Sequence, residues 1–186
     1  NGWIRHGGGQ ELWDELADGF GLKNFMAGNS GVQMGGWFNK EINSADDFKG
    51  LKMRMPGLGG QMVTKLGASV VGMPGGQIYE NLVNGTIDAC EWVGPWNDER
   101  SRFYEAAKYY YWPGMHEPGT LITLGCNKSW LTSLSKTDQM IIEHAATVQN
   151  EMMLTEYNAN NGAALQRLIT DPVSYTHLTL PTNVAV

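Results

Sequence analysis

The stretch that decides the fold is "LKMRMPGLGGQMVTKLGASVVGMPGGQIYENLVNGTIDACEWV", residues 51–93. Within it, apolar runs typical of strands alternate with segments of helical spacing, namely 51–55, 57–67, 69–73, 75–85 and 86–93. This alternation predicts an α/β fold with a mainly parallel sheet covered by helices. In such sheets, ligand sites lie in loops at the carboxyl ends of the strands.

The residues before this stretch continue the pattern. Residues 7–21 have apolar side chains at helical spacing, which predicts a short helix followed by a strand. Its apolar positions are Leu12, Trp13, Leu16 and Phe20. Residues 31–38 are too rich in glycine for a helix. Ser44, with Asp47 three positions later, predicts a helix start before Phe48.

The residues after it contain two more strands and a long helix. Residues 101–114 predict a helix that runs into an aromatic strand, and 120–127 predict a buried strand. From Ser135 a helical pattern continues to about Ile169. Its predicted apolar face consists of Ile141, Ala145, Val148 and Met152.

The two ends of the chain look unlike natural termini. The opening "NGWIRHGGGQ" has no initiator Met and no signal-peptide pattern, so we interpret the chain as a fragment. Residues 173–186 abandon the helical period, and "SYTHLTLPT" within them resembles a translated sequencing adapter. We therefore predict a non-native, adapter-derived tail at 173–186, with a native flexible C-terminus as the alternative.

Composition indicates a globular protein and argues against several functions. Apolar residues make up 42% and charged residues 17% of the 186 residues, which is typical of neither a disordered tail nor a coiled coil. The net charge is −6 and the basic residues are scattered, so we expect no nucleic-acid partner. No apolar run approaches the ~20 residues that cross a bilayer.

Cysteine and histidine spacing gives no catalytic or zinc signature. Cys90 and Cys126 lie in apolar segments, which predicts two buried free thiols, with a disulfide as the alternative. The four histidines show neither an HxxxH nor an HExxH spacing: His6, His116, His144 and His177. No GxSxG elbow occurs, and the glycine clusters match no phosphate-binding fingerprint.

Two charged residues end predicted strands and are candidates for a binding site. Arg54 stands among apolar residues just before a Pro-Gly turn, where its planar fork could hold a carboxylate; the alternative is a surface arginine at a strand end. Glu91 follows Cys90, and a buried carboxylate there would need a cation or a hydrogen-bond donor. Gln33 and Glu117 offer further oxygen atoms, the ligands that Na⁺ or Ca²⁺ prefers.

Several motifs in this order resemble the solute-binding subunit of a TRAP transporter, the DctP-like family. They are "AGNSGVQMGGWF", "LKMRMPGLGGQM", "IDACEWVGPWND", "HEPGT" and "NKSW". The resemblance covers residues 1 to about 170 and is strongest for the branch that binds 2-oxo acids and small monocarboxylates with a metal ion. It implies a two-lobe periplasmic-binding-protein-like fold, with a hinge and an interlobe cleft, whose N-terminal part is missing here.

The resemblance also implies a division of the chain. Residues 1–30 would be a remnant of the first lobe and the start of the crossover, and 31–118 would form the second lobe. Residues 119–172 would contain the elements that return to the first lobe, including the long helix.

The family's site residues transfer to matching positions. The resemblance implies that Gln33, Glu91, the backbone carbonyl of Trp92, and Glu117 bind a metal cation, Na⁺ or Ca²⁺, together with the substrate. It implies that Arg54 binds the substrate carboxylate, with Trp92 and Gln33 beside it. Each position holds the residue type that the family's pattern requires.

The implied function is binding without catalysis. A periplasmic protein would capture a small carboxylate and deliver it to the TRAP membrane permease subunits, and its full-length form could be a homodimer. Two alternatives use the same residues: a metal-dependent lyase or aldolase acting on a 2-oxo acid, and the ligand-sensing domain of a receptor.

Overall fold

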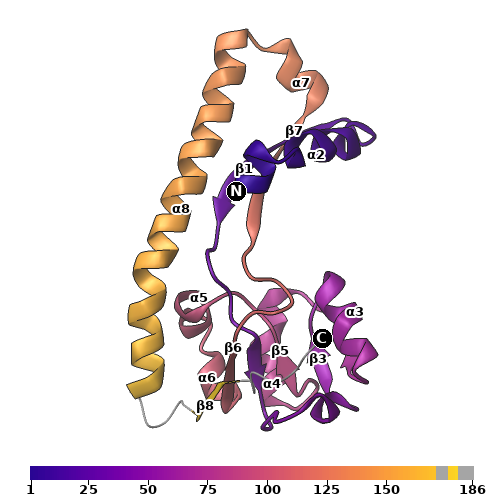
Figure 1. Ribbon diagram of the computed structural model, residues 1–186, viewed down its shortest axis with the longest axis vertical. Coiled ribbons are helices and arrows are strands. Elements are labelled where there is room, and N and C mark those ends of the chain that lie inside the picture. The colour runs from indigo at the N-terminus through magenta and orange to yellow at the C-terminus, as the bar shows by residue number, and fades with distance from the viewer. Residues whose placement is uncertain (171–175, 180–186) are drawn as a thin grey trace. The chain divides into compact units, whose positions relative to one another are not determined.

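The computed structural model describes residues 1–170 and 176–179, and the chain divides into two compact units. Unit 1 consists of Asn1–Ser30 and Leu121–Glu156. Unit 2 consists of Gly31–Thr120 and the described residues from Tyr157 onward (Figure 1). Within the described residues, no helix is both long and apolar enough to cross a membrane.

Unit 1 is built on one antiparallel strand pair. Strand β1 (Leu22–Asn29) pairs with β7 (Leu121–Asn127) over their whole lengths, with an irregularity between Met26 and Gly28. The helices of this unit are α1 (Gly2–His6), α2 (Gly9–Asp18), α7 (Lys128–Ser133) and the first part of α8 (Lys136–Thr170). The helix predicted over 7–21 and the strand predicted after it are therefore confirmed.

Unit 2 contains a six-stranded sheet in the order β4–β3–β5–β2–β6–β8. The strands are β2 (Gly36–Phe38), β3 (Lys52–Arg54), β4 (Ser69–Val70), β5 (Ala89–Cys90), β6 (Tyr109–Trp112) and β8 (Thr176–Thr179). Strands β4, β3 and β5 are parallel, as the β/α alternation predicts. Strand β2 is antiparallel to both β5 and β6, and β8 is parallel to β6. Among the described strands only β2 runs against the others, so the sheet is mainly parallel, as predicted.

Short helices connect these strands. They are η1 (Ala45–Phe48), α3 (Gly57–Lys65), η2 (Gly75–Gln77), α4 (Ile78–Val83), α5 (Pro95–Arg100) and α6 (Phe103–Ala106). The helix start predicted at Ser44 is confirmed, since Ser44 and Asp47 form a reciprocal capping box before η1.

The sheet of unit 2 carries a hydrophobic core on each face. Neighbouring residues of a strand point to opposite faces. Trp37 and Tyr110 accordingly pack with residues of α4 and α6, whereas Phe38 and Tyr111 pack with residues of η1 and α3. The rings of Trp37 and Tyr110 are stacked at 3.9 Å between centroids. Helices therefore contribute to the cores on both faces of the sheet, as predicted for an α/β fold.

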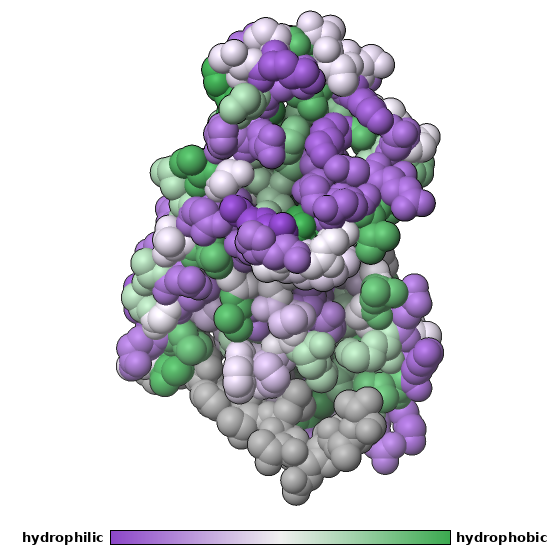
Figure 2. Space-filling model, turned by 45° about the horizontal axis from the view of Figure 1, so that its top comes forward, coloured by the Kyte–Doolittle hydropathy of each residue, from purple (hydrophilic) through white to green (hydrophobic). Residues whose placement is uncertain are grey.

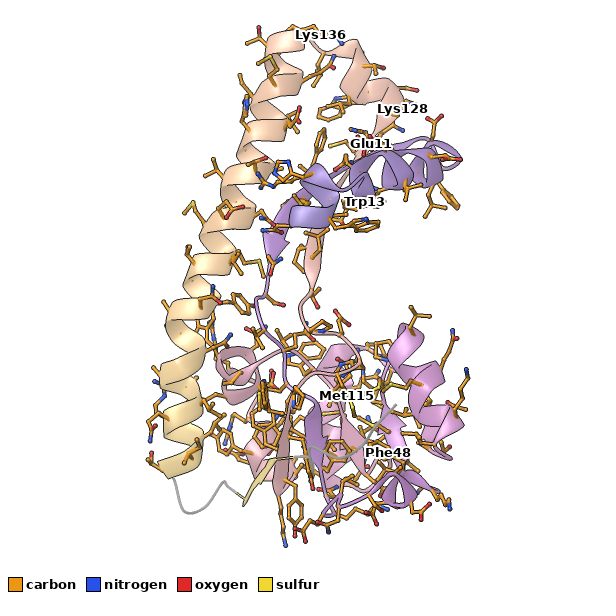
Figure 3. The ribbon with its side chains drawn as sticks, viewed as in Figure 1. Glu11, Trp13, Phe48, Met115, Lys128 and Lys136 are labelled. Atoms are coloured by element: carbon orange, nitrogen blue, oxygen red, sulfur yellow. The ribbon has the colours of Figure 1, made fainter. Side chains whose placement is uncertain are left out.

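Helix α8 supplies residues to both units. The residues of α8 up to Glu156 group with unit 1, and those from Tyr157 group with unit 2 (Figures 1 and 3, where Lys136 marks its first turn). The reason is packing, because the ring of Tyr157 lies edge-on to Trp96 at 5.1 Å. The assignment of the units to the lobes of a larger protein stays a prediction.

The apolar face predicted for this helix is not buried in the described part of the chain. Ile141, Val148 and Met152 are 59%, 56% and 60% exposed. The buried positions of α8 are instead Ala146, Asn150, Tyr157, Ala164 and Leu168. Periodicity identifies apolar side chains, but burial depends on what packs against them.

Helix α2 also exposes apolar side chains. Leu12 and Leu16 are exposed, as is Phe20 just after the helix, whereas Ala17 is buried. Hydrophobic residues lie among hydrophilic ones on the described part of the face in Figure 2. The proposed non-native tail at 173–186 lies outside the described residues, except for the backbone of β8.

Adjacent positions of α2 provide a test of this exposure. Leu16→Gln should change the free energy of unfolding by no more than ~0.5 kcal/mol, because the Leu16 side chain is largely exposed. Ala17→Gln, the matched control, should cost ~1–3 kcal/mol, because a longer side chain must enter a packed site. Urea denaturation of the 186-residue chain measures both. An equal loss in the two variants would contradict the exposure of Leu16.

Candidate site at the carboxyl edge of the sheet

Arg54 and Glu91 meet at one edge of the sheet of unit 2. Arg54 is the last residue of β3 and pairs in register with Cys90, the residue before Glu91. The two strands are parallel, so their carboxyl ends reach the same edge. Arg54 Nη1 forms an ion pair with Glu91 Oε1 and donates to the Glu91 carbonyl oxygen at 3.1 Å. The side chains are 13% and 5% exposed, so this pair is largely removed from water.

Gln33 and Glu117 reach the same edge through the antiparallel strands. The chain enters β2 where β5 and β6 end, and the Gly114 amide donates to the Gln33 carbonyl oxygen at 3.1 Å. Gln33 Nε2 donates to Thr120 Oγ1, which in turn donates to Glu117 Oε1. A hydrogen-bonded chain thus joins two residues that are far apart in sequence.

Gly36 permits the close approach of β2 to the segment that carries Glu91. Its φ is 127°, a backbone conformation that residues with a Cβ atom rarely adopt. A Cβ atom at this position would also overlap the carbonyl oxygen of Cys90. Glycine at this position therefore lets β2 lie against the end of β5.

The carboxylates of this edge form part of a compact ligand cluster. Glu91, His116 and Glu117 each offer one ligand atom, and these atoms lie within 4.8 Å of one another. The cluster holds two carboxylates, and Arg54 pairs with Glu91 alone, which leaves negative charge for a cation to balance. The carboxylate oxygens fit a hard cation, whose ligands are oxygen atoms.

Trp92 lies beside this cluster. Its ring is 5.4 Å from the Arg54 guanidinium carbon, within the range of a cation–π contact, and lies edge-on to Phe103 at 6.2 Å. The structure thus brings the side chains of Gln33, Arg54, Glu91, Trp92 and Glu117 into one unit and connects them by direct contacts or through Thr120. Their roles toward a metal and a substrate stay predictions.

Sequence reasoning missed His116 and Thr120. His116 has no second histidine at metal-binding spacing. Its partners in the cluster are two carboxylates, Glu91, which is distant in sequence, and Glu117, which is the next residue. Thr120 was not singled out as a site residue. The available signal was the position of both residues in "HEPGT", on either side of Glu117.

Asp98 fixes the segment that follows Glu91. Although it lies in α5, its carboxylate accepts hydrogen bonds from the Val93 amide at 3.1 Å, Trp37 Nε1 at 3.0 Å and the Tyr110 hydroxyl at 2.8 Å. It is 0% exposed. Burial raises the pKa of Asp98 to about 7, although the three donors favour its ionised form. Asp98 therefore connects the aromatic core to the loop of the site.

The two cysteines are free and buried, which confirms the prediction of free thiols. Cys90 lies in unit 2 and Cys126 in unit 1. Burial raises the pKa of the Cys90 thiol, so this thiol stays protonated.

Comparison with known proteins gives consistent matches over almost the whole chain. The model of the bacterial extracellular solute-binding protein family 7 matches residues 3–185. A monocarboxylate 2-oxoacid-binding periplasmic protein from Nostoc sp. is 47% identical over 167 residues, which cover 90% of this chain and 46% of that protein.

Solved structures give the same picture. A TRAP periplasmic solute-binding protein from Pseudoalteromonas atlantica, with bound sodium and pyruvate, matches 97% of this chain and 54% of its own, at 42% identity and a TM-score of 0.91. A second solute-binding protein, from Bordetella bronchiseptica, is a mixed-occupancy dimer with copurified calcium and picolinate. The match covers 99% of this chain and 54% of that one, at 41% identity and a TM-score of 0.93. The chain spans about half the length of these relatives.

The pKa of Asp98 predicts a pH dependence of stability. An acid whose pKa is about 7 in the folded state and near 3.8 when unfolded stabilises the fold at low pH, and this contribution is lost as pH rises to about 7. The free energy of unfolding should fall by up to ~1.4 kcal/mol per pH unit in this window. Asp98→Asn should flatten this slope and cost ~1–3 kcal/mol at pH 5, because one donor loses its acceptor. Urea denaturation at several pH values measures both effects.

The control for this prediction is Asp46→Asn, since Asp46 is exposed and pairs with Lys49. This variant should keep the wild-type slope. Identical slopes in wild type and Asp98→Asn would show that Asp98 does not titrate in this window.

Proposed function

The chain belongs to the bacterial extracellular solute-binding protein family 7, and from this membership we propose that the protein containing it captures a small carboxylate with a bound cation. The substrate class is a 2-oxo or 2-hydroxy acid. The protein delivers this acid to a membrane permease of the TRAP type. The relatives described above, which bind pyruvate with sodium or picolinate with calcium, support this substrate class.

The observation that carries the proposal is the largely buried guanidinium of Arg54, which pairs with Glu91, a member of a cluster that also holds the Glu117 carboxylate. Both of its contacts with Glu91 come from Nη1. A ligand carboxylate could therefore use Nη2 and Nε in the bidentate geometry that arginine favours, without breaking the pair with Glu91. One side chain can thus hold Glu91 in place and bind the substrate.

A cation completes the charge balance of this arrangement. The ligand set that we propose is the side-chain oxygens of Gln33, Glu91 and Glu117 with the backbone carbonyl of Trp92. Na⁺ or Ca²⁺ fits these oxygen donors. A 2-oxo or 2-hydroxy acid adds a carboxylate and a neighbouring oxygen that can chelate the ion, so the cation and the acid occupy one site.

The protein binds and releases the acid without chemical change. Family membership also supports a periplasmic location and TRAP permease subunits as partners. The Bordetella relative is a dimer, and a homodimer of the full-length form stays a prediction here.

The binding experiments require more of the protein than this chain. We define the extended protein as this chain joined to the portion of the Nostoc relative that it does not span. Calorimetric titration with a panel of 2-oxo and 2-hydroxy acids, in Na⁺ or Ca²⁺, tests the proposal. Failure of the extended, folded protein to bind any of these acids would exclude the function.

Arg54→Ala should weaken acid binding by roughly a hundredfold to several thousandfold in the extended protein. The reason is that losing one partner of a buried charge pair typically costs ~3–5 kcal/mol. Arg54→Lys should fall between wild type and alanine, because lysine keeps the charge but not the bidentate geometry. Arg102→Ala is the matched control, since Arg102 is exposed. Full affinity in the Arg54→Ala variant, across the acid panel, would contradict the site.

Glu91→Gln should weaken cation binding and, through it, acid binding. The two ligands share one site, so their affinities should be coupled, and the coupling should shrink in the variant. Calorimetry of each acid at several Ca²⁺ concentrations measures it. Glu99→Gln, which removes an acid that pairs with Arg167 elsewhere in unit 2, should leave the coupling unchanged. Unchanged metal content together with unchanged acid affinity in Glu91→Gln would remove Glu91 from the site.

A further inference from the structure

His116 is buried beside the carboxylates without a hydrogen-bond partner. Its side chain is 3% exposed, and neither Nδ1 nor Nε2 makes a hydrogen bond, although Nε2 lies within ion-pair distance of Glu91. Burying a polar nitrogen without a partner is costly, and such groups in proteins usually meet a ligand, an ion or water. The proposed oxygen ligand set gives this imidazole no hydrogen bond, only the approach of Nε2 to Glu91.

Helix α3 packs against the Cβ atom of His116. Gly59 in α3 is buried, and a Cβ atom there would lie 3.1 Å from the His116 Cβ. The helix therefore packs closely over His116. Figure 3 labels Met115, the preceding residue, in the segment that follows β6.

The distance between His116 and Glu91 suits a shared metal ion. His116 Nε2 lies 3.4 Å from Glu91 Oε2, beyond the usual range of an N–H···O hydrogen bond. Two ligand atoms that each lie ~2.1 Å from a tetrahedral ion are ~3.4 Å apart. Arg54 engages the other carboxylate oxygen, Oε1, so Oε2 and Nε2 face each other as two neighbouring ligands.

Glu117 supplies the third ligand. The three ligand atoms lie within 4.8 Å of one another. Tetrahedral ligands at ~2.1 Å from one ion are ~3.4 Å apart, so side-chain shifts of up to about 1.4 Å would close the set. One imidazole with two carboxylates is a mixed set that divalent transition ions accept and that Na⁺ and Ca²⁺, which take oxygen ligands, do not need.

We propose that His116 is a nitrogen ligand that allows this site to bind a divalent transition-metal ion, with Glu91 and Glu117 as its oxygen ligands. The inference rests on the proposed function and deepens it, because the acid would then be captured as a complex with such an ion. A 2-oxo acid can supply the remaining positions of the coordination shell through its carboxylate and its neighbouring oxygen.

The test compares Zn²⁺ with Ca²⁺ in the extended protein without an affinity tag. By titration calorimetry, His116→Gln should weaken Zn²⁺ binding at least ~10-fold, the scale seen when the environment of a metal ligand is altered. Binding of Ca²⁺ should change less than ~3-fold, because Ca²⁺ takes oxygen ligands. His144→Gln is the matched control, since it removes an exposed imidazole from α8 in unit 1.

Spectroscopy of the wild-type protein provides a second readout, which does not depend on how well a variant folds. Pulsed electron paramagnetic resonance of the Mn²⁺-loaded wild-type protein should show coupling to a directly bound imidazole nitrogen. This signal should be absent in His116→Gln and present in His144→Gln.

The outcomes separate the inference from the proposed function. The function stays intact if the extended protein binds pyruvate with Ca²⁺. In that case the inference would be overturned by the absence of nitrogen coupling in the wild-type protein. It would also be overturned by an equal loss of Ca²⁺ and Zn²⁺ affinity in His116→Gln. An equal loss would indicate that His116 only positions Glu91. Absence of acid binding with every cation would overturn the proposed function instead.

Discussion

The buried ion pair between Arg54 and Glu91 is the interaction on which the arrangement of the site depends. It requires that β3 and β5 be parallel and in the register that places Arg54 opposite Cys90. Removing two charges from water is costly unless each keeps a partner. The pair therefore ties the register of two short strands to the position of Glu91, and a shift of the register by one residue would separate the charges.

The β/α order, and the positions of Arg54 and Glu91 at strand ends, could be predicted from sequence. The periodicity of 51–93 specifies successive strands and helices, and parallel neighbours bring their carboxyl ends together. The antiparallel direction of β2 could not be predicted in the same way. Strand β2 is only three residues long and glycine-rich, so it carries little periodic signal.

The rest of the site depends on contacts between distant segments. His116 and Thr120 join the cluster only because β6 returns antiparallel to β2, and no local pattern encodes that return. The exposure of apolar side chains on α2 and α8 has a related reason. Their spacing identifies the apolar side chains but not the surface that would cover them, and Leu16 and Ile141 remain exposed here.

The burial of Cys90 makes this residue a sensor of how the sheet opens. Its thiol lies at the end of β5, next to Glu91, and its raised pKa keeps the reactive thiolate scarce while the strand is packed. An alkylating reagent can reach this sulfur only when β5 separates from its neighbours. The labelling rate of Cys90 therefore reports the free energy of local opening at the strand that carries the site. Any ligand that bridges Arg54 and Glu91 across β3 and β5 would slow that labelling in proportion to its occupancy.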